Sequence, residues 1–119
     1  MGSLSWPKLE NGAAKSTATL EVAILNVRST ACVEFEAAFR QASTLISSMP
    51  GYLAHELRPC VEVSNRYILL VHWRTLEDHS IGFRQSPEYQ KWRSLLHHFY
   101  DPFPSVEHFG PAIITNGAL

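Results

Sequence analysis

Residues 52–73 read YLAHELRPCVEVSNRYILLVHW, and this stretch decides the fold class. Its first part, residues 52–58, alternates apolar and polar side chains, which is typical of a strand with one buried face. Pro59 ends that strand or lies at a sheet edge, because proline has no N–H to donate. After a turn at residues 64–65, residues 66–73 form the strongest β-forming run of the chain. The two runs predict an antiparallel hairpin.

The chain before this hairpin predicts a strand and then a helix. Residues 20–28 are rich in apolar, β-forming side chains, and residues 29–30 (Ser-Thr) are of the types that cap helices. From there the apolar side chains recur at helical spacing, at Phe35, Ala38, Phe39, Ala42, Leu45, Ile46 and Met49. Residues 50–51 (Pro-Gly) then end the helix, because proline cannot continue it and glycine accepts the turn.

The chain after the hairpin predicts a split helix and a last strand. Residues 75–78 (TLED) have the pattern of a capping box, and residues 86–87 (Ser-Pro) form a second helix start. Residues 106–109 predict a short strand. The order is β-α-β-β-α-β, so we expect an α+β, ferredoxin-like domain, in which a four-stranded antiparallel sheet carries its helices on one face. In the second helix, the apolar spacing predicts a buried stripe that consists of Tyr89, Trp92, Leu95, Leu96 and Phe99.

The two ends of the chain lack this periodicity. Residues 1–18 are rich in small and polar side chains and predict a flexible N-terminal arm, in which Trp6 is either mobile or packed on a subunit. We assign the domain to residues 19–110 and a C-terminal tail to residues 111–119. The length of 119 residues agrees with a single domain.

The composition excludes several classes of partner. Ten basic and 11 acidic residues give a net charge of −1, and no basic stripe is present, so we expect no nucleic acid partner. No polybasic run adjoins an apolar helix and no apolar run reaches about 18 residues, so we expect no membrane partner. Cys32 and Cys60 are too few for a disulfide framework and predict reduced thiols in a cytoplasmic protein.

The chain lacks the common catalytic and cofactor motifs. There is no P-loop, G-x-G-x-x-G, G-x-S-x-G or C-x-x-C sequence. The six histidines lack metal-ligand spacing; His97 and His98, for example, are adjacent and point in different directions on a helix. We therefore expect no metal and no cofactor, and we look for site residues among polar side chains inside apolar stripes.

Four polar residues fit that description. Asn26 lies in a strand, where Asn has poor β propensity, and is either a hydrogen-bonded structural amide or a donor to a substrate oxygen. His79 is either a half-buried helix residue or a general base, since imidazole titrates near neutrality. His55 and His72 lie in strands and are expected to pack against neighbours, with His55 kept as a candidate substrate contact.

Four aromatic residues belong either to the core or to the wall of a pocket that binds a flat substrate: Trp73, Phe83, Tyr89 and Trp92. We hypothesise that Asn26 and His79 are catalytic and line one pocket with these aromatic walls. Asn26 would donate to a substrate oxygen, and His79 would accept a proton.

Three stretches resemble antibiotic biosynthesis monooxygenase domains. Residues 49–52 (MPGY) resemble the helix-to-strand junction of that family, and residues 67–73 (YILLVHW) resemble its strand that ends in Trp. Residues 73–89 (WRTLEDHSIGFRQSPEY) resemble its succession of Trp, short helix, Ser-Pro and helix. The resemblance covers residues 20–109, and the order and spacing of the stretches are more specific than any one of them.

The resemblance implies a homodimeric α+β barrel, in which two four-stranded sheets pack face to face. Family members include oxygenases that use no metal, flavin or haem: a phenolic or polyketide-like substrate loses a proton, and the anion reacts with oxygen directly. The resemblance thus implies a cofactor-free oxidoreductase of secondary metabolism with a dry aromatic pocket. For the sheet face that would be exposed without a partner subunit, we expect the apolar side chains of Ala23, Leu25, Leu69 and Val71.

The sequence departs from the family pattern at two places. Many members have a His three residues before the Ser of the second helix; here that position holds Phe83, and His79 lies one turn earlier. Haem-degrading relatives use an Asn, a Trp and a His; Asn26 matches the first, but the other positions hold Phe83 and Arg93, which disfavours haem degradation. Isomerases and cyclases share the superfamily. Three hypotheses follow: a cofactor-independent monooxygenase-like enzyme, a non-oxidative isomerase or cyclase, and a non-catalytic ligand-binding dimer.

Overall fold

A computed structural model describes residues 18–118 of the chain, so most of the predicted N-terminal arm, including Trp6, lies outside the described residues. The order β-α-β-β-α-β is confirmed, with the second helical segment split into three. No helix among residues 18–118 is long and apolar enough to cross a membrane. The elements are β1 (Thr19–Asn26), α1 (Cys32–Ser47), β2 (Tyr52–Pro59), β3 (Arg66–Trp73), the π-helix η1 (Asp78–Phe83), α2 (Pro87–Leu96), the 3-10 helix η2 (His97–Phe99) and β4 (Val106–Phe109).

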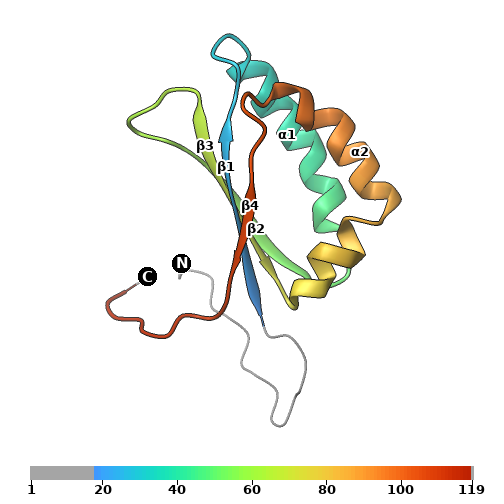
Figure 1. Cartoon of the computed structure of the whole chain (residues 1–119), viewed down its shortest axis with the longest axis vertical. Coiled ribbons are helices and arrows are strands. Elements are labelled where there is room, and N and C mark those ends of the chain that lie inside the picture. Colours follow the sequence, from blue (N-terminus) through green and yellow to red (C-terminus); the bar gives the residue numbers. More distant parts are fainter. Residues whose placement is uncertain (1–17, 119) are drawn as a thin grey trace.

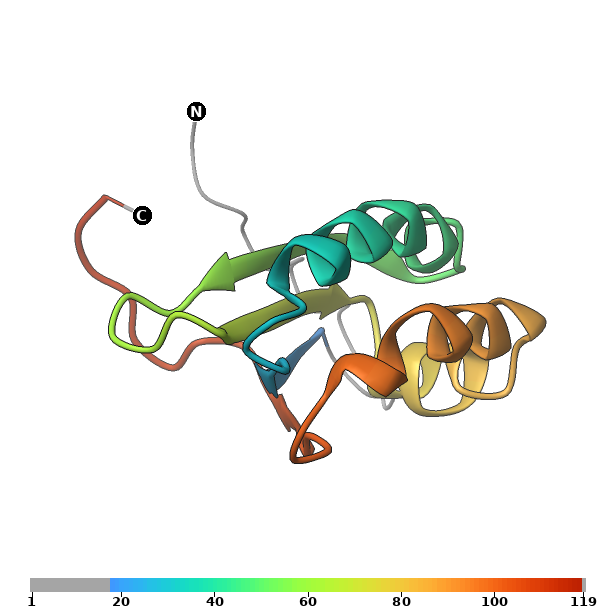
Figure 2. The same cartoon turned by 90° about the horizontal axis from the view of Figure 1, so that it is seen from above.

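The four strands form one antiparallel sheet in the order β2-β3-β1-β4 (Figure 1). Strand β1 therefore lies inside the sheet, paired with β3 along its whole length and with β4 over four residues. Both α1 and α2 cover the same face of the sheet (Figure 2). The expected ferredoxin-like α+β architecture is thus confirmed, and β1 is held rigidly from both sides.

The hydrophobic core lies between the sheet and the two helices. Successive residues of a strand point to opposite faces, so the odd-numbered residues of β1 face the helices and are buried. Ala23, Leu25, Leu69 and Val71 all belong to this core, so our expectation that they form the exposed sheet face is wrong. The opposite face carries Leu20, Val22, Ile24, Ile68 and Leu70. Strands β1 and β3 carry apolar side chains on both faces, so the alternation of their residues could not identify the face that meets the helices.

Side-chain hydrogen bonds lie at the starts of η1 and α2 but not at the start of α1. Helix α1 begins at Cys32 after Ala31 without a side-chain cap, so the predicted Ser-Thr cap at residues 29–30 is wrong. At the start of η1, the Asp78 N–H donates to the Thr75 hydroxyl at 3.1 Å, as the capping pattern predicts. At the start of α2, the Ser86 hydroxyl accepts from the Tyr89 N–H at 3.1 Å, again as predicted.

The turn between α1 and β2 locks against the segment that follows β3. Gly51 has a φ of +81°, a conformation that side chains with a Cβ rarely adopt. Its carbonyl accepts the Arg74 N–H at 2.7 Å, and a Cβ at this position would lie 2.1 Å from Oδ2 of Asp78. The predicted Pro-Gly helix stop is therefore also the contact that positions the start of η1.

We predict that Gly51→Ala lowers the free energy of unfolding by at least about 2 kcal/mol, because the left-handed backbone conformation and the collision with Asp78 both oppose it. Urea denaturation followed by circular dichroism measures the loss. Gly110→Ala is the matched control, since a Cβ there meets no atom within 4 Å. Equal midpoints for the two variants would show that the turn tolerates a side chain.

Candidate functional site

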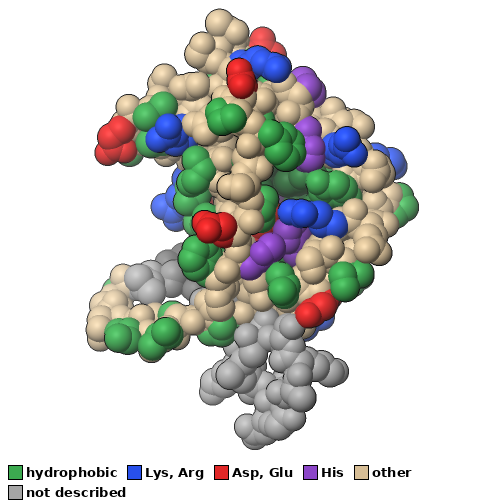
Figure 3. All heavy atoms as spheres, in the orientation of Figure 1, with side chains coloured by type: hydrophobic (Ala, Val, Ile, Leu, Met, Phe, Trp, Pro, Cys, Tyr) green, Lys and Arg blue, Asp and Glu red, His purple; other side chains and the backbone are tan. Residues whose placement is uncertain are grey.

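A cavity of about 320 Å³ lies on the helix side of the sheet, and we refer to it as the helix-side cavity. In Figure 3, histidine and arginine side chains gather around a hollow between β4 and the helices. The polar wall consists of Glu21, His79, Arg84 and His97. The aromatic wall consists of Phe83, Tyr89, Trp92, Tyr100 and Phe103. The cavity thus combines aromatic side chains with a few convergent polar groups, which is typical of small-molecule sites.

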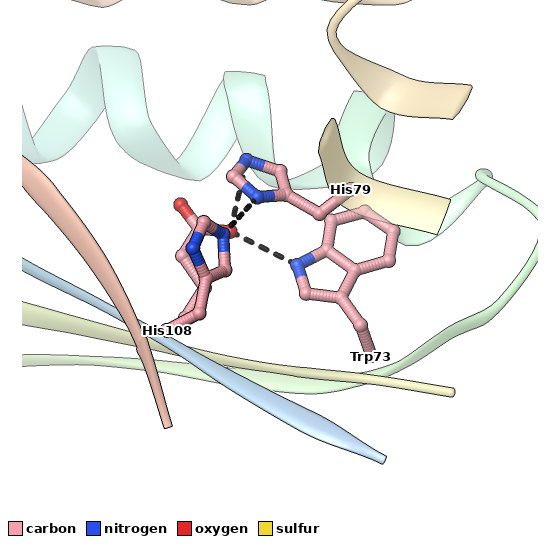
Figure 4. A network of polar contacts seen from close by, with 4 residues as sticks. Trp73, His79 and His108 are labelled. Carbon is pink, nitrogen blue, oxygen red and sulfur yellow. Dashed lines mark hydrogen bonds and ion pairs between the residues drawn. The ribbon is translucent and has the colours of Figure 1, made fainter. Parts of the chain in front are cut away.

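Glu21 projects into this cavity from the centre of the sheet. It occupies an inward position of β1, and only 6% of its surface is exposed. The indole Nε1–H of Trp73 donates to Oε1 of Glu21 at 2.9 Å, and Nε2 of His79 lies 3.3 Å from the same oxygen (Figure 4). Trp73 is the β3 partner of Thr19, two residues from Glu21 on the same face, so register brings the two side chains together.

Burial changes the acidity of this carboxyl group. Desolvation raises the pKa of Glu21 to about 7, although the hydrogen bond from Trp73 and the positive charge of Arg84 oppose the shift. A carboxyl group with a pKa near 7 can both accept and release a proton at neutral pH. Glu21 is therefore the best placed general base among the residues of the cavity wall.

His79 lies beside Glu21 as a neutral imidazole. Its ring stacks on Trp73 at a centroid distance of 5.5 Å, and 2% of its surface is exposed. Burial lowers the pKa of His79 to about 3, and the nearby charge of Arg84 and the His108 ring contribute to the shift. His79 is in the cavity as predicted, but such a low pKa makes it a weak proton acceptor, so the predicted role of primary base passes to Glu21.

His108 extends this network to the surface. It is the β4 register partner of Glu21, and its Nε2 lies 2.8 Å from Nδ1 of His79 (Figure 4). His108 is exposed to solvent. The side chains of Glu21, His79 and His108 therefore form a continuous series of polar contacts from the buried carboxyl group to solvent. Sequence reasoning assigned no role to Glu21 or His108.

The predicted aromatic residues gather at this site. Phe83, Tyr89 and Trp92 line the cavity, and the rings of Phe83 and Trp92 meet edge to face with centroids 5.6 Å apart. Trp73 lies beneath them, fully buried, and reaches the cavity through its bond to Glu21. The two alternatives for these rings are therefore compatible, because the same side chains form part of the core and enclose the cavity.

Asn26 does not share this cavity, so our hypothesis that it lines one pocket with His79 is wrong. As an even-numbered residue of β1, Asn26 points to the sheet face away from the helices. Its Oδ1 accepts from Nε of Arg66 at 2.9 Å, and its carbonyl oxygen accepts from the Asp101 N–H at 2.8 Å. These hydrogen bonds agree with the first alternative given for Asn26, a hydrogen-bonded structural amide, and not with a donor to a substrate oxygen.

His55 lies in a different place, between β2 and α1. Its Nδ1 is 2.5 Å from the hydroxyl of Tyr52, and its Nε2 is 3.1 Å from the hydroxyl of Ser43. It borders a separate cavity of about 320 Å³ against α1. His55 therefore packs against its neighbours, as the strand position predicted, and it does not contact the helix-side cavity.

His79 and His108 form a hydrogen-bonded pair and not a metal cluster. Among residues 18–118, no group of three or more His, Cys, Asp or Glu side chains has an arrangement that could hold a metal ion. The expectation of a metal-free and cofactor-free site stays a prediction. Glu21, which the sequence analysis did not select, gives a weak signal in the sequence, because it is the one acidic residue of a mostly apolar strand and lies in phase with Ala23 and Leu25.

We predict that Glu21→Gln makes the protein more resistant to alkaline conditions. The folded-state pKa of Glu21 is raised from 4.5 to about 7, so ionisation favours the unfolded chain, and the free energy of unfolding falls as the pH rises through this window. Relative to wild type, the variant should gain up to about 3 kcal/mol between about pH 5 and about pH 9. Denaturant titrations at both pH values measure the difference, and a pH-independent difference would contradict the burial of an ionisable Glu21.

Comparisons with known proteins agree with this fold. The family model described as Antibiotic biosynthesis monooxygenase matches residues 20–95. An uncharacterised Bacillus subtilis (strain 168) protein, YczJ, is 56% identical over 89 residues, which are 75% of this chain and 94% of the relative.

Two solved structures show the same architecture. One from Bordetella bronchiseptica, whose name places it provisionally among antibiotic biosynthesis monooxygenases, superposes with a TM-score of 0.77 at 31% identity and covers 82% of this chain and 100% of that chain. SnoaB from Streptomyces nogalater, a cofactor-independent oxygenase, has a TM-score of 0.67 at 20% identity, covering 84% and 97%, a likeness of fold alone. On the match over residues 20–95 and the identity to its relatives, the chain belongs to the antibiotic biosynthesis monooxygenase family.

Proposed function

We propose that this protein is a cofactor-independent monooxygenase-like enzyme that acts on a small phenolic or enolisable molecule of the polyketide or quinol kind. The observation that carries the proposal is Glu21, a buried carboxyl group with a pKa of about 7 in the wall of an aromatic cavity. An oxygenase without a cofactor needs such a base, because oxygen reacts with the electron-rich anion of the substrate and not with its protonated form.

The first step is removal of a proton. A phenol or an activated C–H group of a flat substrate, stacked between the aromatic walls, would face the Glu21 carboxylate, which accepts the proton. The Trp73 N–H holds that carboxylate in one orientation, and the ring of His79 lies beside it. Because Glu21 is itself nearly fully buried, the substrate anion that faces it would form where nearby charges and dipoles act strongly.

The proton then has a route out of the site. Protonated Glu21 donates to Nε2 of His79, while Nδ1–H of His79 donates to Nε2 of the exposed His108, which releases a proton to solvent. His79 gains and loses a proton in the same event and never needs to become a cation. A strongly lowered pKa of His79 is therefore compatible with its part in the relay.

Oxygen reacts next with the anion. The substrate transfers an electron to O2, and the two radicals combine into a peroxide with a new C–O bond. The peroxide takes up a proton from solvent and then loses water together with the hydrogen that remains on the same carbon, which leaves a carbonyl group, so one oxygen atom stays in the product and the other leaves as water. The family match and the fold shared with a cofactor-independent oxygenase support this chemistry for the chain, whereas the uncharacterised relative says nothing about the substrate.

A non-oxidative isomerase or cyclase is the second candidate, favoured by the same observation. A base that removes a proton and a relay that returns it are sufficient for enolisation without oxygen. The two functions differ in one measurable property, the consumption of O2 during turnover.

We predict that anthrones, naphthols or quinols support oxygen uptake by the purified protein, and that Glu21→Gln lowers kcat by about 10²–10⁴-fold, as expected for loss of a positioned base. Glu34→Gln, an exposed carboxylate on α1, is the matched control and should retain the wild-type rate. An oxygen electrode measures the rates. Deuterium exchange at a substrate carbon under anaerobic conditions, without oxygen uptake by any substrate in air, would favour the isomerase; ligand binding without any turnover would favour a binding protein.

We also propose that the protein is a homodimer that buries the sheet face opposite the helices. That face presents Leu20, Val22, Ile24, Ile68 and Leu70, and Ile24 is 44% exposed in a single chain. Neither α1 nor α2 covers it (Figure 2). A second copy of the same apolar sheet would bury this surface on both subunits, as symmetric dimers do.

We predict that the wild type is a dimer at micromolar concentration, and that Ile24→Glu shifts it toward monomer because a charge would be buried without a partner. Val33→Glu is the control, since Val33 is an equally apolar side chain on α1 that is 81% exposed. Light scattering coupled to size-exclusion chromatography measures the mass. A monomeric wild type, or dimers of equal stability for both variants, would contradict this interface.

A further inference from the structure

The helix-side cavity contains one permanent charge, that of Arg84. This residue follows η1 directly, borders the cavity and is exposed. Among residues 18–118, no carboxylate forms an ion pair with its guanidinium. The one acid among the lining residues is Glu21, which is nearly fully buried, so Glu21 and Arg84 lie at different depths of the cavity.

The charge of Arg84 acts on the pKa values of four groups at or beside the cavity: Glu21, His79, His97 and His108. Desolvation is the largest cause of the lowered pKa values of His79, His97 and His108. Arg84 lowers each of them further, after Arg93 in the case of His97, and it also opposes the rise of the pKa of Glu21. All three imidazoles are thereby kept neutral near pH 7, so they do not add to the positive charge. The cavity therefore has a single cationic group at its rim and a single carboxyl group at depth.

We propose that Arg84 forms an anion subsite at the mouth of the helix-side cavity, and that the substrate is an aromatic or polyketide-like carboxylic acid. Its carboxylate would pair with the Arg84 guanidinium, while its phenol or acidic C–H group faces Glu21. This substrate class rests on the proposed function of the site. A guanidinium matches a carboxylate with two parallel N–H···O bonds, and the neutral ring of His97 offers a further N–H donor beside it.

The subsite separates anchoring from reaction. A permanent anion pairs with the exposed arginine, where part of its hydration is kept, whereas the reacting group enters the buried end beside Trp73 and Glu21. Two fixed points at different depths define one orientation of a flat molecule. Arg84 is thus a specificity-determining residue, and it is not required for proton removal itself.

Binding of a matched ligand pair under anaerobic conditions tests this proposal without turnover. The probes are 6-hydroxy-2-naphthoate and its primary amide, which differ in the anionic group, and isothermal titration calorimetry gives each Kd. Wild type should bind the acid several-fold to about tenfold more tightly than the amide, with the preference falling as salt is added. Arg84→Gln should lose the preference, Arg84→Lys should keep part of it, and Arg74→Gln, an exposed arginine outside the cavity, should leave it unchanged.

Three results would overturn the anion subsite: equal affinity of wild type for acid and amide, a preference that survives in Arg84→Gln, or no binding of either probe at millimolar concentration. These results are independent of the reaction. Loss of the acid preference in Arg84→Gln, in a protein that consumes no oxygen with any substrate, would support the subsite and contradict the oxygenase. Oxygen uptake with neutral phenols that is unaffected by Arg84→Gln, together with equal Kd values, would support the oxygenase and overturn the subsite.

Discussion

The buried contact between the Glu21 carboxyl group and the Trp73 indole N–H is the interaction on which the candidate site depends. A carboxyl group in an apolar interior is costly unless its oxygens accept hydrogen bonds. The cost is moderated here because register in the sheet brings the indole to the carboxyl group, and the ring of His79 lies beside both. Within residues 18–118, no buried side-chain nitrogen or oxygen lacks a partner, so the site is polar without being strained by unpaired groups.

The elements that surround this contact are those that hold it in place. Strand β1 is paired on both edges, so Glu21 cannot move without the sheet. The turn at Gly51 and the Thr75 cap direct the chain from the end of β3 back over the sheet, which places His79 above Trp73. The short helix η1, which follows this cap, is a π-helix, a form found frequently at functional sites. Its two buried residues, His79 and Phe83, both line the cavity.

Much of the architecture could be predicted from the sequence, because local signals agree with the final fold. The bounds of β3, the caps at Thr75 and Ser86 and the Pro-Gly stop all follow from side-chain chemistry that acts within a few residues. The site was harder to predict because it depends on which face of β1 meets the helices. That strand is apolar on both faces, so Asn26 was assigned to the wrong side and Glu21 was overlooked. Only the register with β4 shows that Glu21 and His108, far apart in the chain, are neighbours.

The alternation along β1 also has an evolutionary consequence. Side chains that touch the cavity and side chains that form the opposite sheet surface are interleaved in one short segment, yet no single residue serves both. Mutations can therefore alter one surface while the other is left intact, even at adjacent codons. The residues of such a strand that line the cavity and those that form the opposite surface can evolve separately, so homologues with similar cavities can differ in quaternary structure, and the reverse.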